Sequence, residues 1–169
     1  MEQTTLDQIQ QLLDIEAIKK LKARYCNYAD SGKDADEFAA LFTEHAILDE
    51  GDDGVFPGRE NIRQMYKSLS PYFKLNQHLV FSPIIDISGD VATGDWRLLQ
   101  LCTTEHPEGD RAFWACGFYK ERYLRIDGEW KFEHVEARVH FCCDYAEGWA
   151  KAPWGELLPV KARSALGLD

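Results

Sequence analysis

Four long apolar runs in the second half of the chain restrict its fold more than any other feature. Short segments with turn residues separate them, and the last of these, Asp127-Gly128, is typical of a two-residue β-hairpin. Hairpins in series make an antiparallel sheet. Strands of such length twist and coil, so we expect a strongly curved sheet with one concave face. The expected strands cover residues 77–87, 91–104, 111–126 and 129–142.

The first third of the chain is predicted to be helical. A long helix is indicated by apolar residues that recur every three or four positions, with basic residues between them. Shorter helices are expected after Asp34 and from about Arg59, with a short strand over residues 45–50 between them. The expected buried face of the long helix comprises Ile18, Leu21, Tyr25 and Tyr28, and its solvent face comprises Lys19, Lys20, Lys22 and Arg24.

The order of these elements, helices first and strands later, favours the α+β class. A helix laid across the concave face of the sheet would close it into a cone with one interior pocket. At 169 residues the chain has the length of one domain. We expect one α+β domain over residues 1–144. The remaining tail, residues 145–169, contains Trp149 and Trp154 and is expected to act as a lid or as an interface segment.

Charge and composition exclude several classes of function. With 19 basic and 29 acidic residues the net charge is −10, which disfavours binding to a nucleic acid backbone. No apolar stretch has the length of a membrane span or of a signal peptide, so we expect no membrane association. The five cysteines, an odd number without a C-x-x-C pair, are interpreted as reduced thiols of a cytoplasmic protein.

Motifs for cofactors are also absent from the sequence. It contains no glycine-rich phosphate loop, no H-E-x-x-H segment and no G-x-S-x-G segment. Cys142 and Cys143 are adjacent and close to His140, but three side chains on one strand seldom complete a tetrahedral metal site. We therefore expect chemistry on a small-molecule substrate, with no cofactor and no metal.

Six segments, spread over most of the chain, follow a pattern shared with known proteins. They are residues 15–25, Asp30 with residues 33–42, the run Phe56-Pro57-Gly58-Arg59-Glu60, residues 77–80, residues 91–96 and residues 123–132. With these segments the chain resembles the nuclear transport factor 2-like superfamily, and within it the polyketide-cyclase-like (SnoaL-like) branch. The resemblance implies a cystatin-like α+β roll, in which N-terminal helices pack on a strongly curved antiparallel sheet.

Within this branch the chain is similar to members that eliminate small leaving groups. These are the scytalone dehydratases, the bile acid 7α-dehydratases and the hexachlorocyclohexane dehydrochlorinases. They share an Asp at the end of the first helix and a His early on the first long strand, and Asp30 and His78 occupy these positions. A carboxylate beside an imidazole fixes the tautomer of the ring and favours general base catalysis. The resemblance therefore implies a catalytic pair, and the alternative is a buried structural pair.

Three further sites are candidates for contact with a substrate. Tyr25 matches a tyrosine of the bile acid enzymes, and it either packs in the core or acts as a catalytic residue that donates a hydrogen bond to the developing enolate oxygen. Glu50 stands where such dehydratases often place a tyrosine, and it either ends a strand in solvent or points inward as an acid. Trp114, Cys116 and Phe118 alternate on the third long strand, where scytalone dehydratases carry a second His. They are expected to line the pocket or to fill the core.

These expectations combine into one leading hypothesis and two alternatives. The leading hypothesis is a cofactor-independent lyase that performs a dehydratase-like elimination on a small hydrophobic oxygenated compound. A double-bond isomerase or an aldol-type cyclase would use the same proton transfer, and a non-catalytic ligand-binding or scaffold module would use none. The resemblance and the broad exposed sheet also imply a homo-oligomer, either a dimer or a trimer.

Overall fold

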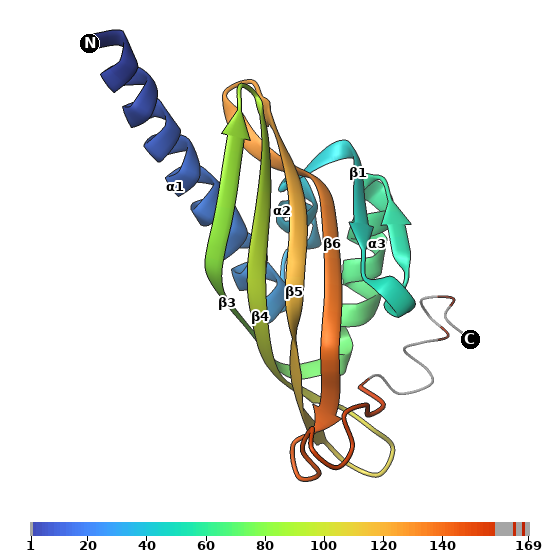
Figure 1. Ribbon diagram of the computed structural model, residues 1–169. Helices are drawn as coiled ribbons and strands as arrows, with labels where there is room; N and C mark the ends of the chain where they lie inside the picture. Colours follow the sequence, from blue (N-terminus) through green and yellow to red (C-terminus); the bar gives the residue numbers. More distant parts are fainter. Residues whose placement is uncertain (1, 158–163, 165–166, 168–169) are drawn as a thin grey trace.

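The computed structural model of the protein describes residues 2–157, 164 and 167 (Figure 1). Its elements follow the expected order, with helices in the first half and long strands in the second. The helices are α1 (Glu2–Ser31), α2 (Ala35–Ala40) and α3 (Arg59–Leu69), with short 3-10 helices at Gly51–Asp53 and Ser70–Tyr72. The strands are β1 (Phe42–Asp49), β2 (Val55–Pro57), β3 (Phe73–Ser88), β4 (Val91–Thr104), β5 (Arg111–Ile126) and β6 (Glu129–Asp144).

One six-stranded sheet in the order β2-β1-β6-β5-β4-β3 forms the body of the molecule. Strands β3 to β6 pair in series as antiparallel hairpins, whereas β1 runs parallel to β6. The turn between β5 and β6 has a positive φ at both Asp127 (52°) and Gly128 (82°), as a type I′ hairpin requires. The predicted α+β class and the predicted series of hairpins are therefore confirmed.

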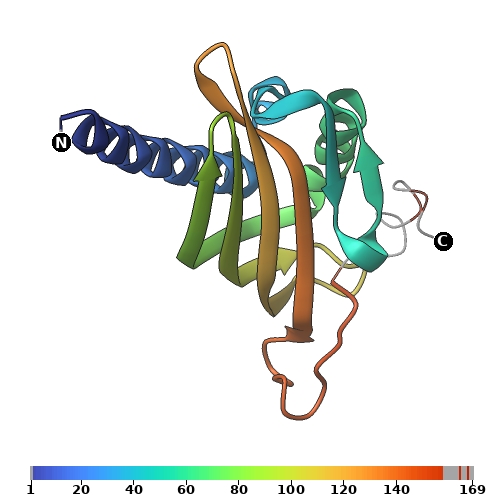
Figure 2. The ribbon, with the colours of Figure 1, turned by 45° about the horizontal axis from the view of Figure 1, so that its top comes forward.

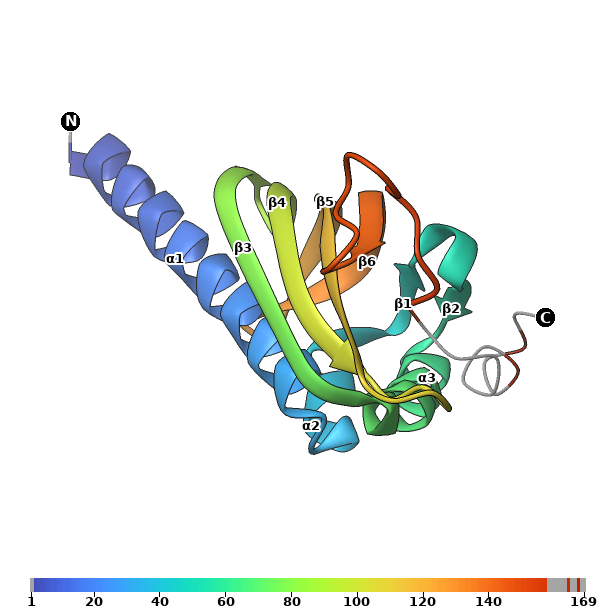
Figure 3. The same ribbon diagram turned by 90° about the horizontal axis from the view of Figure 1, so that it is seen from below.

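The sheet is strongly curled, and a bulge at Gly117 contributes to the bend. The register between β5 and β6 shifts between Cys116 and Gly117, and a Cβ on Gly117 would lie 2.0 Å from the backbone oxygen of Arg138. Only glycine allows so close an approach of the two backbones. Helix α1 packs along β3, and α2 and α3 lie on the same side of the curled sheet (Figures 2 and 3). This arrangement creates the enclosed space that the sequence predicts.

Aromatic side chains from α1, α2, β1 and β6 form the centre of the core. The ring of Tyr25 contacts the rings of Phe38, Phe42 and Phe132, at centroid distances of 5.2, 6.2 and 5.5 Å. The buried face of α1 includes Ile18, Leu21 and Tyr25 as predicted, and Tyr28 is half-buried. The helical spacing of apolar residues therefore identifies the side of α1 that faces the sheet.

The predicted solvent face of α1 is wrong at Lys22, which is fully buried. Its Nζ donates a hydrogen bond of 2.5 Å to Oε1 of Glu121 on β5, and neither side chain is exposed. Nζ also lies 3.3 Å from the ring centroid of Tyr119 and 4.3 Å from that of Tyr25. The core tolerates this ammonium group because an opposite charge and two aromatic faces surround it.

All five cysteines are free thiols. In the part of the chain that the structure describes, no helix is both long enough and apolar enough to cross a membrane. Nor do any three His, Cys, Asp or Glu side chains of these residues gather closely enough to hold a metal ion.

Candidate active site

A cavity of about 470 Å³ lies between the helices and the concave face of the sheet. Its walls combine aromatic and aliphatic side chains with a small number of polar groups, which is the composition expected of a small-molecule site. The apolar wall includes Phe38, Phe56, Met65, Leu69, Phe73 and Leu98, and the polar groups include Tyr25, Glu50, Asn76, His78, Gln100 and Tyr119.

Asp30 and His78 meet at the wall of this cavity. Asp30 lies in the last turn of α1, and His78 lies on β3, the strand that packs against α1. The Asp30 carboxylate accepts a hydrogen bond of 2.6 Å from Nδ1–H of His78, and both carboxylate oxygens accept from the His78 backbone N–H, at 3.0 and 3.1 Å. The Asp30 and His78 side chains are only 16% and 10% exposed. Because Nδ1 carries the proton, the neutral ring keeps its lone pair on Nε2, where it can accept a proton.

Two tyrosines bring hydroxyl groups to the same cavity. Tyr25 comes from α1 and Tyr119 from β5, and their rings lie 6.0 Å apart in an edge-to-face arrangement. Burial raises the pKa of both phenols well above their ordinary value. Both hydroxyl groups therefore stay protonated near neutral pH and can donate hydrogen bonds to a substrate oxygen. The sequence pattern singles out Tyr25 but not Tyr119.

Glu50 directly follows β1 and lines the cavity. Burial raises the pKa of its carboxyl group to about 7, and the charge of Asp53 acts in the same direction. Near neutral pH a large fraction of this carboxyl group is therefore protonated and can donate a proton. Of the two interpretations of Glu50 offered by the sequence, the structure matches the inward-pointing one.

The prediction that Trp114, Cys116 and Phe118 line the pocket or fill the core is wrong. These side chains point to the convex face of the sheet, where each is partly exposed. Side chains of a strand alternate between faces, and the concave face of β5 takes Ala115 and Tyr119 instead. The alternation shows which residues share a face, but it does not show which face is inward.

Comparison with known proteins identifies the family to which the chain belongs. A family model described as "SnoaL-like domain" matches residues 10–136. The chain belongs to the SnoaL-like family. The predicted resemblance to the nuclear transport factor 2-like superfamily and to its SnoaL-like branch is thereby confirmed.

Solved structures of similar fold include three that bear on this SnoaL-like protein. A putative scytalone dehydratase from Novosphingobium aromaticivorans DSM 12444 is 24% identical over 80% of this chain and 89% of that chain, with a TM-score of 0.72. A hexachlorocyclohexane dehydrochlorinase (LinA) Type2 is 19% identical over 81% and 92%, with a TM-score of 0.74. A protein of unknown function with a cystatin-like fold, from Nostoc punctiforme PCC 73102, is 24% identical over 75% and 91%, with a TM-score of 0.62. These likenesses confirm the predicted cystatin-like fold.

Part of the predicted tail reaches the cavity of this SnoaL-like protein. The backbone N–H of Cys142 donates to Pro153 O at 3.0 Å, and that of Gly155 donates to Cys142 O at 2.7 Å, so this segment pairs with the end of β6. Residues 154–157 line the cavity. Trp149 lies elsewhere, stacked on Phe141 at a centroid distance of 5.3 Å. Residues 158–163, 165, 166, 168 and 169 of the tail lie outside the described residues.

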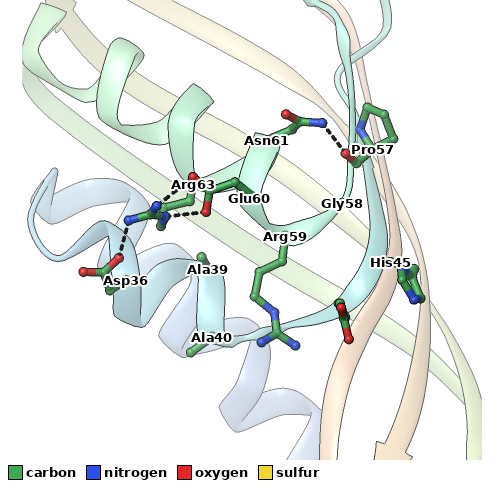
Figure 4. Close-up of a pocket in the computed structure, with 11 residues that line it drawn as sticks. Asp36, Ala39, Ala40, His45, Pro57, Gly58, Arg59, Glu60, Asn61 and Arg63 are labelled. Carbon is green, nitrogen blue, oxygen red and sulfur yellow. Dashed lines mark hydrogen bonds and ion pairs between the residues drawn. The ribbon is translucent and has the colours of Figure 1, made fainter.

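A second hollow, of about 550 Å³, lies between α2, β1 and the start of α3 (Figure 4). Arg63 forms ion pairs there with Asp36 at 3.0 Å and with Glu60 at 2.7 Å (Figure 4). His45 and Arg59 also line it. None of the site residues expected from the sequence lies at this hollow, so the cavity with Asp30 and His78 is the candidate active site.

Proposed function

We propose that this SnoaL-like protein is a cofactor-independent lyase. Its reaction would be a dehydratase-like elimination from a small, partly apolar, oxygenated compound. The observation that carries the proposal is the hydrogen bond of 2.6 Å between Asp30 and Nδ1 of His78 at the wall of a cavity. An oriented imidazole that faces a cavity of mixed apolar and polar lining suits the removal of a proton from carbon.

In the first step, Nε2 of His78 takes a proton from a carbon next to a substrate carbonyl group. The electron pair of the broken C–H bond moves toward the carbonyl oxygen and forms an enolate. Tyr25 and Tyr119 donate hydrogen bonds to this oxygen as its negative charge develops. The carboxylate of Asp30 stays ionised and stabilises the imidazolium that forms on His78.

In the second step, the enolate re-forms the carbonyl group and expels a hydroxyl group from the β-carbon. Glu50 in its acid form transfers a proton to the departing oxygen, so that water leaves and an α,β-unsaturated carbonyl compound remains. The proton held by His78 then passes through solvent to Glu50. Both groups thus return to their starting states.

The value of kcat/KM for elimination is expected to fall as the pH rises through about 7, because the protonated form of Glu50 is the active one and burial sets its pKa near that value. Replacing Glu50 with Gln should remove this descending limb and lower kcat by about 10²-fold. A pH–rate profile measures both effects. The control Glu44→Gln changes an exposed carboxyl group on β1 and should keep the wild-type profile. Wild-type rates in Glu50→Gln would contradict the acid role.

Product analysis tests the proposed reaction itself. The protein would be incubated with β-hydroxy ketones such as 4-hydroxy-4-phenylbutan-2-one, and the products would be examined by mass spectrometry. Elimination lowers the mass by one water and yields a conjugated enone that absorbs in the near ultraviolet. A double-bond isomerase or an aldol-type cyclase would conserve the mass of its substrate. Saturable binding of the panel without any turnover would favour a non-catalytic ligand-binding module.

The position of residues 153–157 supports a lid function for the tail. It pairs with the end of β6 and adds Trp154 to the cavity wall. A closed site excludes water and strengthens the polar contacts to an enolate. We therefore propose that this part of the tail acts as a lid, whereas Trp149 lies against Phe141 on the sheet.

We also infer that the protein assembles as a homo-oligomer, either a dimer or a trimer, through the convex face of the sheet. Leu79 and Phe81 of β3 are about half exposed there, beside Leu99 on β4. A contiguous exposed apolar face of this kind marks an interaction site. Leu79→Glu should shift the protein toward monomer in sedimentation velocity. Ile126→Glu, at the β5–β6 hairpin, is the control, and an unchanged state in Leu79→Glu would contradict the assignment.

A further inference from the structure

Gln100 lies directly opposite His78 in the ladder between β3 and β4. Residues opposite each other in an antiparallel pair share a face, with Cβ atoms roughly 4.5–5.5 Å apart. Both residues line the cavity. The amide group of Gln100 is therefore within reach of the same part of a bound molecule that His78 would deprotonate.

Two successive hydrogen bonds determine the orientation of the Gln100 amide group, that is, which side carries the oxygen and which the nitrogen. The backbone oxygen of Ala29, near the end of α1, can only accept, so the group that faces it at 3.3 Å must be Nδ2 of Asn76. Oδ1 of Asn76 then faces Gln100 and accepts from Nε2 of Gln100 at 2.7 Å. Asn76 is only 7% exposed, so solvent does not compete for these contacts. The side-chain amides of Asn76 and Gln100 can therefore make these two hydrogen bonds in only one orientation each.

This orientation leaves the oxygen of Gln100 unused. Nothing among the described residues donates a hydrogen bond to its Oε1. A glutamine amide also carries a second N–H beside the one that Asn76 accepts. An amide oxygen and an N–H at a cavity wall suit a hydroxyl group, which donates to the first and accepts from the second.

We propose that Gln100 binds a hydroxyl group of the substrate other than the one that leaves. The substrate class would then be hydroxylated carbonyl compounds, with one hydroxyl group held beside the carbon that His78 deprotonates. This assignment deepens the proposed elimination and rests on it for the identity of the reacting carbon. The binding preference itself requires no turnover, so it can be measured separately.

The test measures the binding of 1-indanone and of its four derivatives with one hydroxyl group on the aromatic ring, by isothermal titration calorimetry. The four derivatives are isomers of one another. At least one hydroxylated isomer should bind the wild-type protein about 5- to 10-fold more tightly than 1-indanone, as one net hydrogen bond provides. Gln100→Leu should abolish this preference while leaving the affinity for 1-indanone within about twofold. Gln100→Met is a second variant of similar length, and thermal unfolding verifies that each variant is folded.

Two controls separate this proposal from the proposed reaction. Gln77→Leu makes the same chemical change at an exposed glutamine on the opposite face of β3, and it should keep the preference. His78→Ala should keep the preference although elimination is lost. Equal affinities across the isomers, no binding of any of them, or an unchanged preference in Gln100→Leu and Gln100→Met would overturn the assignment. Loss of the preference in Gln100→Leu together with absent elimination in the wild type would refute only the lyase.

Discussion

Elimination by the His78→Ala variant is expected to be about 10²- to 10⁴-fold slower in kcat/KM than in the wild type, the range that removal of a general base produces. The variant lacks the Nε2 lone pair that takes the substrate proton, and no other imidazole lines the cavity within the described residues. The measurement is the initial rate of enone formation from a β-hydroxy ketone. Because the His78 side chain lies at the cavity wall, we expect the variant to fold.

Asp30→Asn tests the same pair by replacing the carboxylate that orients His78. An Asn amide can turn its N–H₂ group toward Nδ1 of His78, which would move the ring proton to Nε2 and remove the base without changing the size of the side chain. The loss in kcat/KM should therefore approach that of His78→Ala. His45→Ala removes an exposed imidazole from β1 and serves as the control. Turnover near the wild-type rate in either Asp30→Asn or His78→Ala would refute the mechanism.

Replacing Lys22 with Met should lower the free energy of unfolding by about 3–5 kcal/mol. The substitution keeps the length of the side chain but leaves the carboxylate of Glu121 buried without its cation. The hydroxyl group of Tyr123 donates to that carboxylate and is not a substitute for the lost charge. Urea unfolding at neutral pH, followed by circular dichroism, measures the effect.

A second substitution should reverse most of this loss. Glu121→Gln in the Lys22→Met background removes the unpaired charge and keeps an oxygen that can accept from Tyr123. As a control, Lys19→Met disrupts an exposed pair with Glu16 on the same helix and should leave the free energy of unfolding nearly unchanged. If the double variant were less stable than Lys22→Met alone, the explanation by an unpaired buried charge would fail.

Sequence patterns predict the bounds of the strands best where turn residues flank both ends. The predicted ranges of β4 and β5 match the structure at both ends, because turn residues such as Gly89 and Gly109 precede them and Asp127-Gly128 follows β5. The start of β3 is missed by four residues, since the polar Lys74 and Asn76 break the apolar pattern of an edge strand. Residue types in the sequence thus predict a strand end well where a turn follows or precedes it, and less well where no turn residue marks the end.

Burial of Lys22 could not be predicted from its surroundings in the sequence. Its partner Glu121 lies 99 residues away, so helical spacing has no information on the pairing. The same limit applies to Gln100, whose orientation depends on Asn76 and on the end of α1. Asp30 and His78 were predictable because a family resemblance supplied the long-range pairing that a single sequence lacks.

The parallel pairing of β1 with β6 has a consequence for how the chain folds. The ion pair between Asp49 on β1 and Arg138 on β6 joins positions 89 residues apart. Strand β1 therefore cannot pair with β6 until most of the chain has been synthesised. Closing so long a loop carries an entropic cost before any contact forms, and non-local pairings of this kind slow folding. A nascent chain on the ribosome would therefore expose the apolar face of β1 while β3 to β5 already form hairpins, and the cavity would be completed only as β6 emerges.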